Sequence, residues 1–180
     1  RRVAIRSESQ DPAQAASLNA YLADEMMVSL STLGFDCRVF DNPLSGTGCG
    51  PFLVATRHEG ADLPTVLMYG HGDVIRGQDA SWTRGQGPWA LACEGDKLYG
   101  RGTADNKGQH SINIAALAMV IAARGGRLGF NATWLFETGE ETGSPGLAEF
   151  CALQRDLLAA DVLIASDGPR LRADAPTLFL

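Results

Sequence analysis

The sequence Thr65-Val-Leu-Met-Tyr-Gly-His-Gly-Asp73 carries the clearest structural pattern in this chain. Its segment Val66–Tyr69 is apolar throughout, which is typical of a strand buried on both faces of a sheet. Two residues that can bind ligands, His71 and Asp73, follow directly after this run. In open α/β sheets, ligands bind beyond the carboxyl ends of the strands. The stretch therefore predicts a central strand with a functional site at its end.

Helical and strand patterns alternate on both sides of this segment. Helices are predicted over residues 13–33 with Gly34 as the C-cap, over Lys107–Ala123, and from the N-cap Ser144 and Pro145 to about Leu158. Strands are predicted at Cys37–Phe40, Phe52–Thr56, Thr65–Tyr69, Phe130–Phe136 and Asp161–Ala165, and another begins at Thr177. This order predicts an α/β domain with a mostly parallel sheet and helices on both faces.

The composition is that of a globular domain, with 45% hydrophobic residues and a net charge of −6 over 180 residues. Without a Lys/Arg cluster, no nucleic-acid partner is expected. No apolar run approaches the length of about 18 residues that a membrane span needs, so no membrane partner is expected either. Wide spacing of the cysteines argues against a thiolate zinc site or a disulfide framework and predicts a cytoplasmic protein; they are Cys37, Cys49, Cys93 and Cys151.

One imidazole and five carboxylates lie at the ends of predicted elements. They are His71 and Asp73 after strand 65–69, Asp105 ahead of helix 107–123, Glu140 and Glu141 after strand 130–136, and Asp167 after strand 161–165. Carboxylates held together repel one another unless a cation neutralises them. Histidine and carboxylate ligands without cysteine suit Zn²⁺ or Mn²⁺ in a hydrolytic site. Because the ligands exceed what one catalytic zinc needs, two divalent metal ions are predicted.

Each motif has an ordinary structural explanation when it is taken alone. A His two residues from an Asp can be a surface hydrogen bond, and Glu140-Glu141 can be a solvated turn. Asp167-Gly168-Pro169 can simply form a turn. The glycine-rich Gly100–Gly108 lacks the phosphate-loop patterns, which weakens the alternative of a nucleotide-binding domain. The prediction of a metal site therefore depends on the joint occurrence of these motifs, in order, at the ends of strands.

Two histidines and one long segment lie outside these motifs. His58 is interpreted as a surface residue and His110 as a helix side chain, neither with a functional context. The segment Gly70–Gly102 is irregular and glycine-rich, and a loop of this length inside a compact domain usually carries function.

Together the motifs resemble the co-catalytic zinc metallopeptidase family that contains acetylornithine deacetylase, succinyl-diaminopimelate desuccinylase, carboxypeptidase G, aminoacylase and carnosinase-type dipeptidases. The matching stretches are MYGHGDV (68–74), LYGRGTADNKG (98–108), FETGEETGS (136–144) and SDG (166–168), in the order and spacing of the family. The resemblance implies hydrolysis of an amide or peptide bond in a small substrate, an N-acyl amino acid or a dipeptide, by a bridging hydroxide.

The resemblance also implies a role for each residue of the site. His71 and Asp167 would bind one metal ion, Glu141 would bind the other, and Asp105 would bridge both. The metal would be zinc, with manganese or cobalt as alternatives. A cis peptide bond is expected after Asp105.

Two further carboxylates receive supporting roles from the resemblance. Asp73 would fix the tautomer of the His71 imidazole, which requires a carboxylate close to the ring. Glu140 would be the general base, next to the metal ligand Glu141. Adjacent side chains diverge at a turn, so one can face a metal while the other faces water.

Members of this family are about twice as long as this chain, so residues 1–180 are expected to be the N-terminal portion of the catalytic domain. A lid or dimerisation domain and the C-terminal catalytic portion would lie elsewhere, and a homodimer would be compatible with them. A fifth ligand, a late histidine, would also be missing, since no histidine follows His110. The chain alone is expected to be a poor catalyst. The alternative is a non-catalytic metal-binding fragment or homologue.

Overall fold

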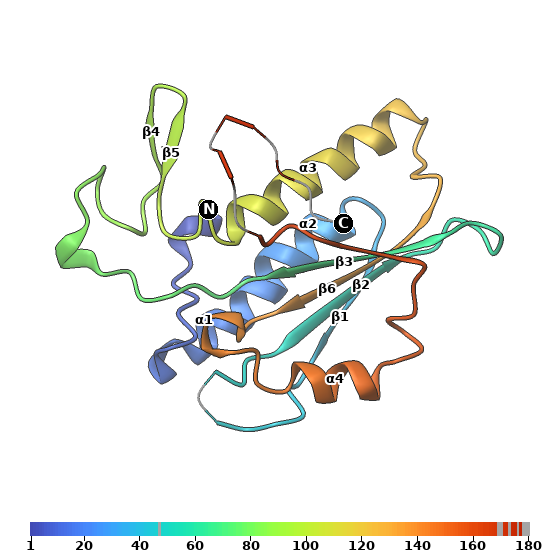
Figure 1. The fold of residues 1–180 in the computed structure, drawn as a ribbon, viewed down its shortest axis with the longest axis horizontal. Coiled ribbons are helices and arrows are strands. Elements are labelled where there is room, and N and C mark those ends of the chain that lie inside the picture. Colours follow the sequence, from blue (N-terminus) through green and yellow to red (C-terminus); the bar gives the residue numbers. More distant parts are fainter. Residues whose placement is uncertain (47, 169–170, 173, 176, 178–180) are drawn as a thin grey trace.

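The computed structural model describes residues 1–180 except 47, 169–170, 173, 176 and 178–180. Its main sheet has five strands in the order β1 (Asp36–Phe40), β2 (Phe52–Arg57), β6 (Asn131–Glu137), β3 (Thr65–His71) and β7 (Val162–Ala165) (Figure 1). Strand β3 pairs in parallel with β6 and β7, whereas β2 is antiparallel to both of its neighbours. Four strands therefore run in one direction, which confirms the predicted mostly parallel sheet.

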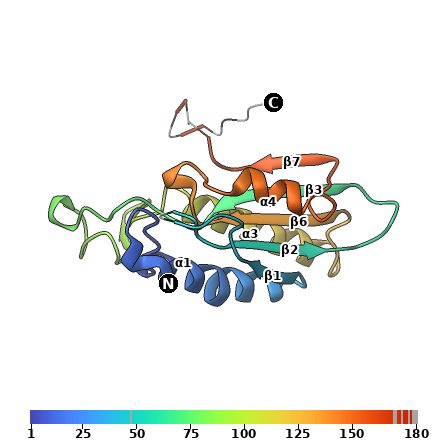
Figure 2. The ribbon, with the colours of Figure 1, turned by 90° about the horizontal axis from the view of Figure 1, so that it is seen from below.

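Helices cover both faces of this sheet, as predicted (Figure 2). A continuous N-terminal helical stretch and the long α3 (Lys107–Ala123) lie on one face, and α4 (Leu147–Leu153) lies on the other. Side chains alternate along β6: Trp134 and Phe136 belong to the first core, and Leu135 belongs to the core under α4. This alternation follows from the two-residue period of a strand, and it makes β6 the buried centre of the domain.

The N-terminal helical stretch consists of η2 (Pro12–Gln14), α1 (Ala15–Ala20), η3 (Tyr21–Met27) and α2 (Val28–Ser31). It begins where the carboxylate of Asp11 accepts a hydrogen bond from the Ala13 N–H at 3.0 Å. It is followed by Gly34 with φ +78°, which confirms the predicted C-terminal glycine. The segment η3 is a π-helix, a local widening that the hydrophobic pattern did not indicate.

The start of α4 differs from the prediction. The helix begins at Leu147 after Gly146, which has φ +86°, rather than after Ser144. The backbone of Ser144 has a left-handed conformation, with φ +53°, and its hydroxyl donates a hydrogen bond to Glu137 Oε1 at 2.9 Å. The predicted N-cap was wrong because a tertiary hydrogen bond to a buried carboxylate replaces the local cap.

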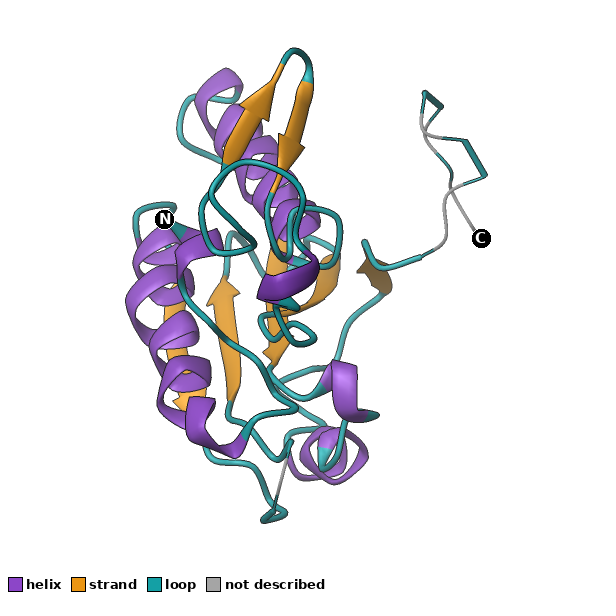
Figure 3. Cartoon of the chain, turned by 90° about the vertical axis from the view of Figure 1, so that its left-hand side faces the viewer, coloured by secondary structure: helices purple, strands orange, loops and turns teal. Residues whose placement is uncertain are grey.

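The long segment between β3 and α3 contains a hairpin that was not predicted. Strands β4 (Ala92–Glu94) and β5 (Lys97–Tyr99) pair antiparallel and extend beyond the main sheet (Figure 3). The strand expected at Thr177–Leu180 falls largely outside the described residues. None of the described helices has the length and apolar character needed to cross a membrane.

Candidate metal centre

The predicted site residues come from ends of elements that meet at one edge of the sheet. His71 is the last residue of β3, and Asp167 lies two residues after β7. These neighbouring strands are parallel, so their carboxyl ends lie side by side. Asp105 lies two residues before α3, and its carboxylate contacts His71 at the same edge. Segments far apart in sequence thus bring their polar side chains to one place.

The imidazole of His71 is fully buried, and three carboxylates surround its Nε2 atom. Nε2 lies 2.9 Å from Asp105 Oδ1, 3.4 Å from Asp167 Oδ2 and 3.8 Å from Glu140 Oε2. Ligand atoms of His71, Glu140 and Asp167 all lie within 4.8 Å of one another. The structure therefore brings together four of the predicted residues in an arrangement that a divalent cation could occupy.

Asp73 is also fully buried, and its carboxylate lies next to the His71 imidazole. His71 Nδ1 lies 3.1 Å from the backbone oxygen of Asp73 and 3.3 Å from its Oδ1, so that nitrogen carries a proton toward Asp73 and Nε2 faces the three carboxylates. The same carboxylate accepts hydrogen bonds from the backbone N–H groups of Glu140 at 3.2 Å and Glu141 at 3.1 Å. Asp73 thus sets both the orientation of the imidazole and the position of the Glu140–Glu141 turn.

Glu141 makes no ion pair with His71 within the described part of the chain, although it lies near Asp105. With Asp105 it lines a neighbouring cavity of about 350 Å³, whose wall also includes Trp82, Tyr99 and Arg101. Among the described carboxylates, Glu140 rather than Glu141 makes the contact with His71. The division of roles between these two glutamates therefore stays a prediction.

Glycines allow the loop that carries Asp105 to fold tightly against α3. The Gly108 N–H donates to Gly102 O at 2.9 Å, and a Cβ on Gly108 would lie 1.9 Å from Thr103 O. No side chain fits there, so the close packing of this loop against the first turn of α3 requires glycine at position 108. The peptide bond between Asp105 and Asn106 is cis, as expected.

The electrostatics of the group favour a cation. Burial lowers the pKa of His71, but hydrogen bonds with Asp105 and Asp73 and the surrounding negative charge raise it to about 11. Burial raises the pKa of Glu140 and of Glu141, and neighbouring carboxylates contribute to both shifts. Within the described part of the chain, the ion pairs of Asp105, Glu140 and Asp167 are with His71 and not with Lys or Arg. One imidazolium cannot balance these carboxylates, and the donor set suits Zn²⁺ or Mn²⁺.

A buried carboxylate next to the site was missed by the sequence analysis. Glu137 ends β6 directly opposite His71, and its Oε1 accepts hydrogen bonds from the hydroxyls of Tyr69 and Ser144. Burial raises the pKa of Glu137. Its place at the end of a strand, three residues before Glu140, was the available signal.

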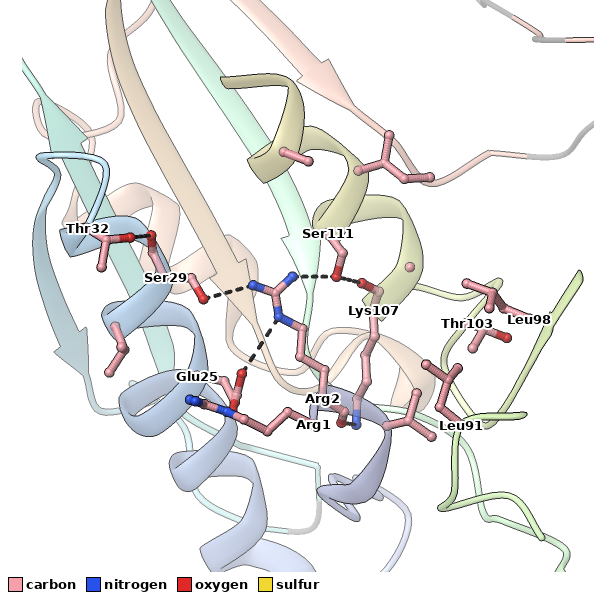
Figure 4. Close-up of a pocket in the computed structure, with 15 residues that line it drawn as sticks. Arg1, Arg2, Glu25, Ser29, Thr32, Leu91, Leu98, Thr103, Lys107 and Ser111 are labelled. Carbon is pink, nitrogen blue, oxygen red and sulfur yellow. Dashed lines mark hydrogen bonds and ion pairs between the residues drawn. The ribbon is translucent and has the colours of Figure 1, made fainter. Parts of the chain in front are cut away.

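A larger cavity of about 700 Å³ lies between the N-terminal segment, α2 and α3, and the six predicted site residues are not part of its wall (Figure 4). Its charged groups bind one another. The Arg2 guanidinium contacts Glu25, Ser29 and Ser111, and the Lys107 ammonium donates to the backbone oxygen of Arg2 at 3.1 Å. Because the charged groups of this cavity are paired with one another, the group around His71 remains the candidate functional site.

Comparisons with known proteins identify relatives of this chain. Over 128 residues the chain is 34% identical to the cysteinylglycine-S-conjugate dipeptidase of Corynebacterium striatum, an alignment that covers 70% of this chain and 27% of that protein. It is 37% identical over 142 residues to a succinyl-diaminopimelate desuccinylase of Methylobacterium sp. (strain 4-46), covering 77% of this chain and 33% of that protein. The chain thus spans about a third or less of the length of these relatives.

The fold has a counterpart among solved structures. Human carnosine dipeptidase 1 superposes with a TM-score of 0.83 at 28% identity, covering 93% of this chain and 37% of that one. Residues 67–177 match the peptidase family M20/M25/M40, and all six predicted site residues lie inside this range. Since the match extends over more than half of its residues, the chain belongs to peptidase family M20/M25/M40.

Proposed function

We propose that the protein carrying this chain hydrolyses an amide or peptide bond in a small substrate, a dipeptide or an N-acyl amino acid. The observation that carries the proposal is the convergence of Asp105, Glu140 and Asp167 on the buried imidazole of His71. Relatives named as dipeptidases, a desuccinylase and an acetylornithine deacetylase support hydrolysis of carbon–nitrogen bonds.

The proposal includes two divalent metal ions, zinc or alternatively manganese or cobalt. His71, Asp105 and Asp167 would hold one ion, and Asp105 and Glu141 would contribute to the second. When bound, such ions polarise a carbonyl group and lower the pKa of water. The second ion would need a further ligand from outside this chain, since no histidine follows His110.

Glu140 is proposed as the general base. Its side chain is 38% exposed, so water can reach it, while its carboxylate lies 3.8 Å from His71 Nε2. Asp73 holds the backbone N–H of Glu140 and thereby fixes the start of the turn. From this position Glu140 would take a proton from the attacking water and pass it to the leaving amine.

The test is the substitution Glu140→Gln in the full-length protein. Loss of the proton acceptor should lower the rate of dipeptide or N-acyl amino acid hydrolysis by about 10²–10⁴-fold. Metal content, measured by atomic absorption, should stay unchanged. The exposed Glu149 provides a matched control, since Glu149→Gln removes the same charge on α4 and should leave the rate unaltered. A Glu140→Gln enzyme with the original rate would contradict the role.

A non-catalytic metal-binding protein is the second candidate. It is favoured by the donors proposed for the second ion, since the described residues offer it Asp105 and Glu141. Metal titration and an amidase assay on the same sample separate the two functions. Metal binding together with turnover supports the hydrolase, whereas metal binding without turnover supports the binding protein.

A further inference from the structure

A buried line of hydrogen bonds connects the N-terminal helical stretch with the candidate metal centre. The Tyr21 hydroxyl lies 2.6 Å from His110 Nε2, and His110 Nδ1 lies 3.0 Å from Asn106 Oδ1. Each of these three residues is at most 1% exposed. Their polar groups therefore depend on one another for hydrogen bonds, because bulk water cannot replace a lost partner.

The amide of Asn106 is the point where this line meets the segments that carry the metal ligands. Its Oδ1 accepts the backbone N–H of His71 at 3.3 Å, and its Nδ2 donates to the backbone oxygen of Ser166 at 3.2 Å. Asn106 itself follows Asp105 in the chain, and Ser166 precedes Asp167. One amide thus joins the ends of β3 and β7 to the start of α3.

The hydrogen-bond partners fix the orientation of both side chains. Asn106 Nδ2 faces two acceptors, Ser166 O and Gln109 Oε1, so Oδ1 must be the atom that faces His71 N–H and His110. His110 consequently carries its proton on Nδ1, and its Nε2 accepts from the Tyr21 hydroxyl. Burial lowers the pKa of His110 well below its ordinary value, so the ring is neutral and both nitrogens have partners.

Packing prevents the His110 ring from turning away. The rings of Tyr21 and Phe136 stand edge-on to it, with centroids 5.8 Å and 5.2 Å away. On the side of β3, a Cβ on Gly70 would lie 3.4 Å from His110 Cβ and 3.1 Å from Asn106 Oδ1. The ring can therefore hold the Asn106 amide in one position.

We propose that His110 is a positioning residue for the metal centre, which sets the spacing of His71, Asp105 and Asp167 through the amide of Asn106. The inference rests on the metal centre of the proposed function. His110 touches none of the reacting atoms. If it only filled the core, its replacement would lower stability without a specific change in metal binding. A positioning residue requires that ligand geometry and metal affinity change as well.

The experiment uses Co²⁺ as the probe in the full-length protein, because its visible absorption reports the geometry of the ligands. In His110→Phe both hydrogen bonds are lost while an aromatic ring remains. Groups that orient metal ligands typically change metal affinity by about 10–100-fold, so the cobalt affinity of His110→Phe should fall by that factor and its spectrum should change. In His110→Asn the side-chain amide nitrogen takes the place of Nδ1, and this variant should recover most of the affinity.

Leu30→Ala is the matched control, because Leu30 is fully buried in the same core and makes no side-chain hydrogen bond. It should lower the melting temperature while cobalt affinity and spectrum stay as in the unsubstituted protein. An unchanged cobalt affinity and spectrum in His110→Phe would overturn the inference.

If His110→Phe does not fold, ¹H–¹⁵N NMR of the unsubstituted metal-free protein replaces it. A proton on His110 Nδ1 supports the inference, and a proton on Nε2 overturns it.

The two proposals can fail separately. Weaker cobalt binding in His110→Phe, in a protein that hydrolyses no amide, would refute the proposed function and support the positioning role. Normal hydrolysis with equal cobalt affinity in both proteins would overturn the positioning role and leave the function standing.

Discussion

The buried carboxylate of Asp73 interacts with three donors. It lies next to His71 Nδ1, and it accepts hydrogen bonds from the backbone N–H groups of Glu140 and Glu141. A carboxylate has enough lone pairs for these three donors, whereas a side-chain amide has one acceptor atom and an NH₂ group. The requirement for a carboxylate is therefore a matter of hydrogen bonding as well as charge.

Asp73→Asn tests this requirement at almost constant volume. Its NH₂ group would replace one of the two carboxylate oxygens, which now accept the backbone N–H groups of Glu140 and Glu141, and would leave one of these N–H groups without an acceptor. We expect a loss of about 1–3 kcal/mol in the free energy of unfolding and metal affinity weaker by about 10–100-fold. Denaturant titration and competition with a chelator measure the two effects. The exposed Asp96 is the control, and an Asp73→Asn protein as stable as Asp96→Asn would contradict the argument.

Among the elements, the turn between α3 and β6 is held in place by one carboxylate after β2. Glu59 accepts hydrogen bonds from the Leu128 N–H at 3.0 Å and the Gly129 N–H at 3.3 Å, and its Oε1 also lies 2.8 Å from Arg57 Nε. The hydrogen bond from Leu128, followed by the bond from Gly129 and the charge of Arg57, lowers the pKa of Glu59 to about 2, against the effect of burial. The charged form is thus the one that the fold stabilises.

This shift gives a pH dependence with a definite sign. Because the pKa of Glu59 is lower in the folded protein than in the unfolded chain, its contribution is complete at neutral pH. The contribution declines as the pH falls from about 4.5 toward about 2. Glu59→Gln should therefore be less stable than the parent at pH 7, and the difference should shrink in acid. Thermal unfolding of both proteins between pH 2 and pH 7 measures it. A difference independent of pH would contradict the assignment.

Elements whose identity depends on local pattern were predictable. The apolar run Val66–Tyr69 gave β3, and the bounds of α3 were predicted as the structure has them. Elements whose form depends on distant partners were not. Ser144 turns to a buried carboxylate instead of capping α4. Nothing in the periodicity of residues 13–33 signals the π-helix η3.

The same distinction applies to the site. Residue types at the ends of elements were enough to predict six site residues, and the structure brings four of them together; they are His71, Asp105, Glu140 and Asp167. The contacts of Glu137 and of His110 depend on side chains from other elements, such as Tyr69 and Tyr21, and sequence spacing does not disclose them. His110 was interpreted as an ordinary helix side chain, although it is buried and doubly hydrogen-bonded.

At the scale of the whole molecule, the group around His71 is assembled from both halves of the chain. His71 and Asp105 precede β6, and Glu140 and Asp167 follow it. A metal ion bound by His71 and Asp167 would join the ends of two adjacent parallel strands, β3 and β7. Binding and folding are then coupled, since the ion binds an arrangement that the unfolded chain lacks.

Within the described part of the chain, β7 lies at the edge of the main sheet, and this position gives a bound ion a structural role. Among the described strands, β7 pairs with β3 over four positions, and its apolar side chains Val162, Leu163 and Ile164 are 48–64% exposed. Its start is tied to the sheet by Asp161, whose backbone N–H donates to Thr65 O at 2.9 Å. Beyond the end of β7, a metal ion bound by Asp167 would hold this end of the strand against β3.

Removal of the metal by a chelator should therefore accelerate amide hydrogen exchange in β7 far more than in the central strand β6, because β6 keeps its hydrogen bonds to β2 on one side and β3 on the other. Exchange followed by mass spectrometry, with and without added Zn²⁺, compares the two strands in one sample. An equal acceleration in both strands would mean that the ion stabilises the domain as a whole. The outermost strand would then be no more prone to fray than the innermost.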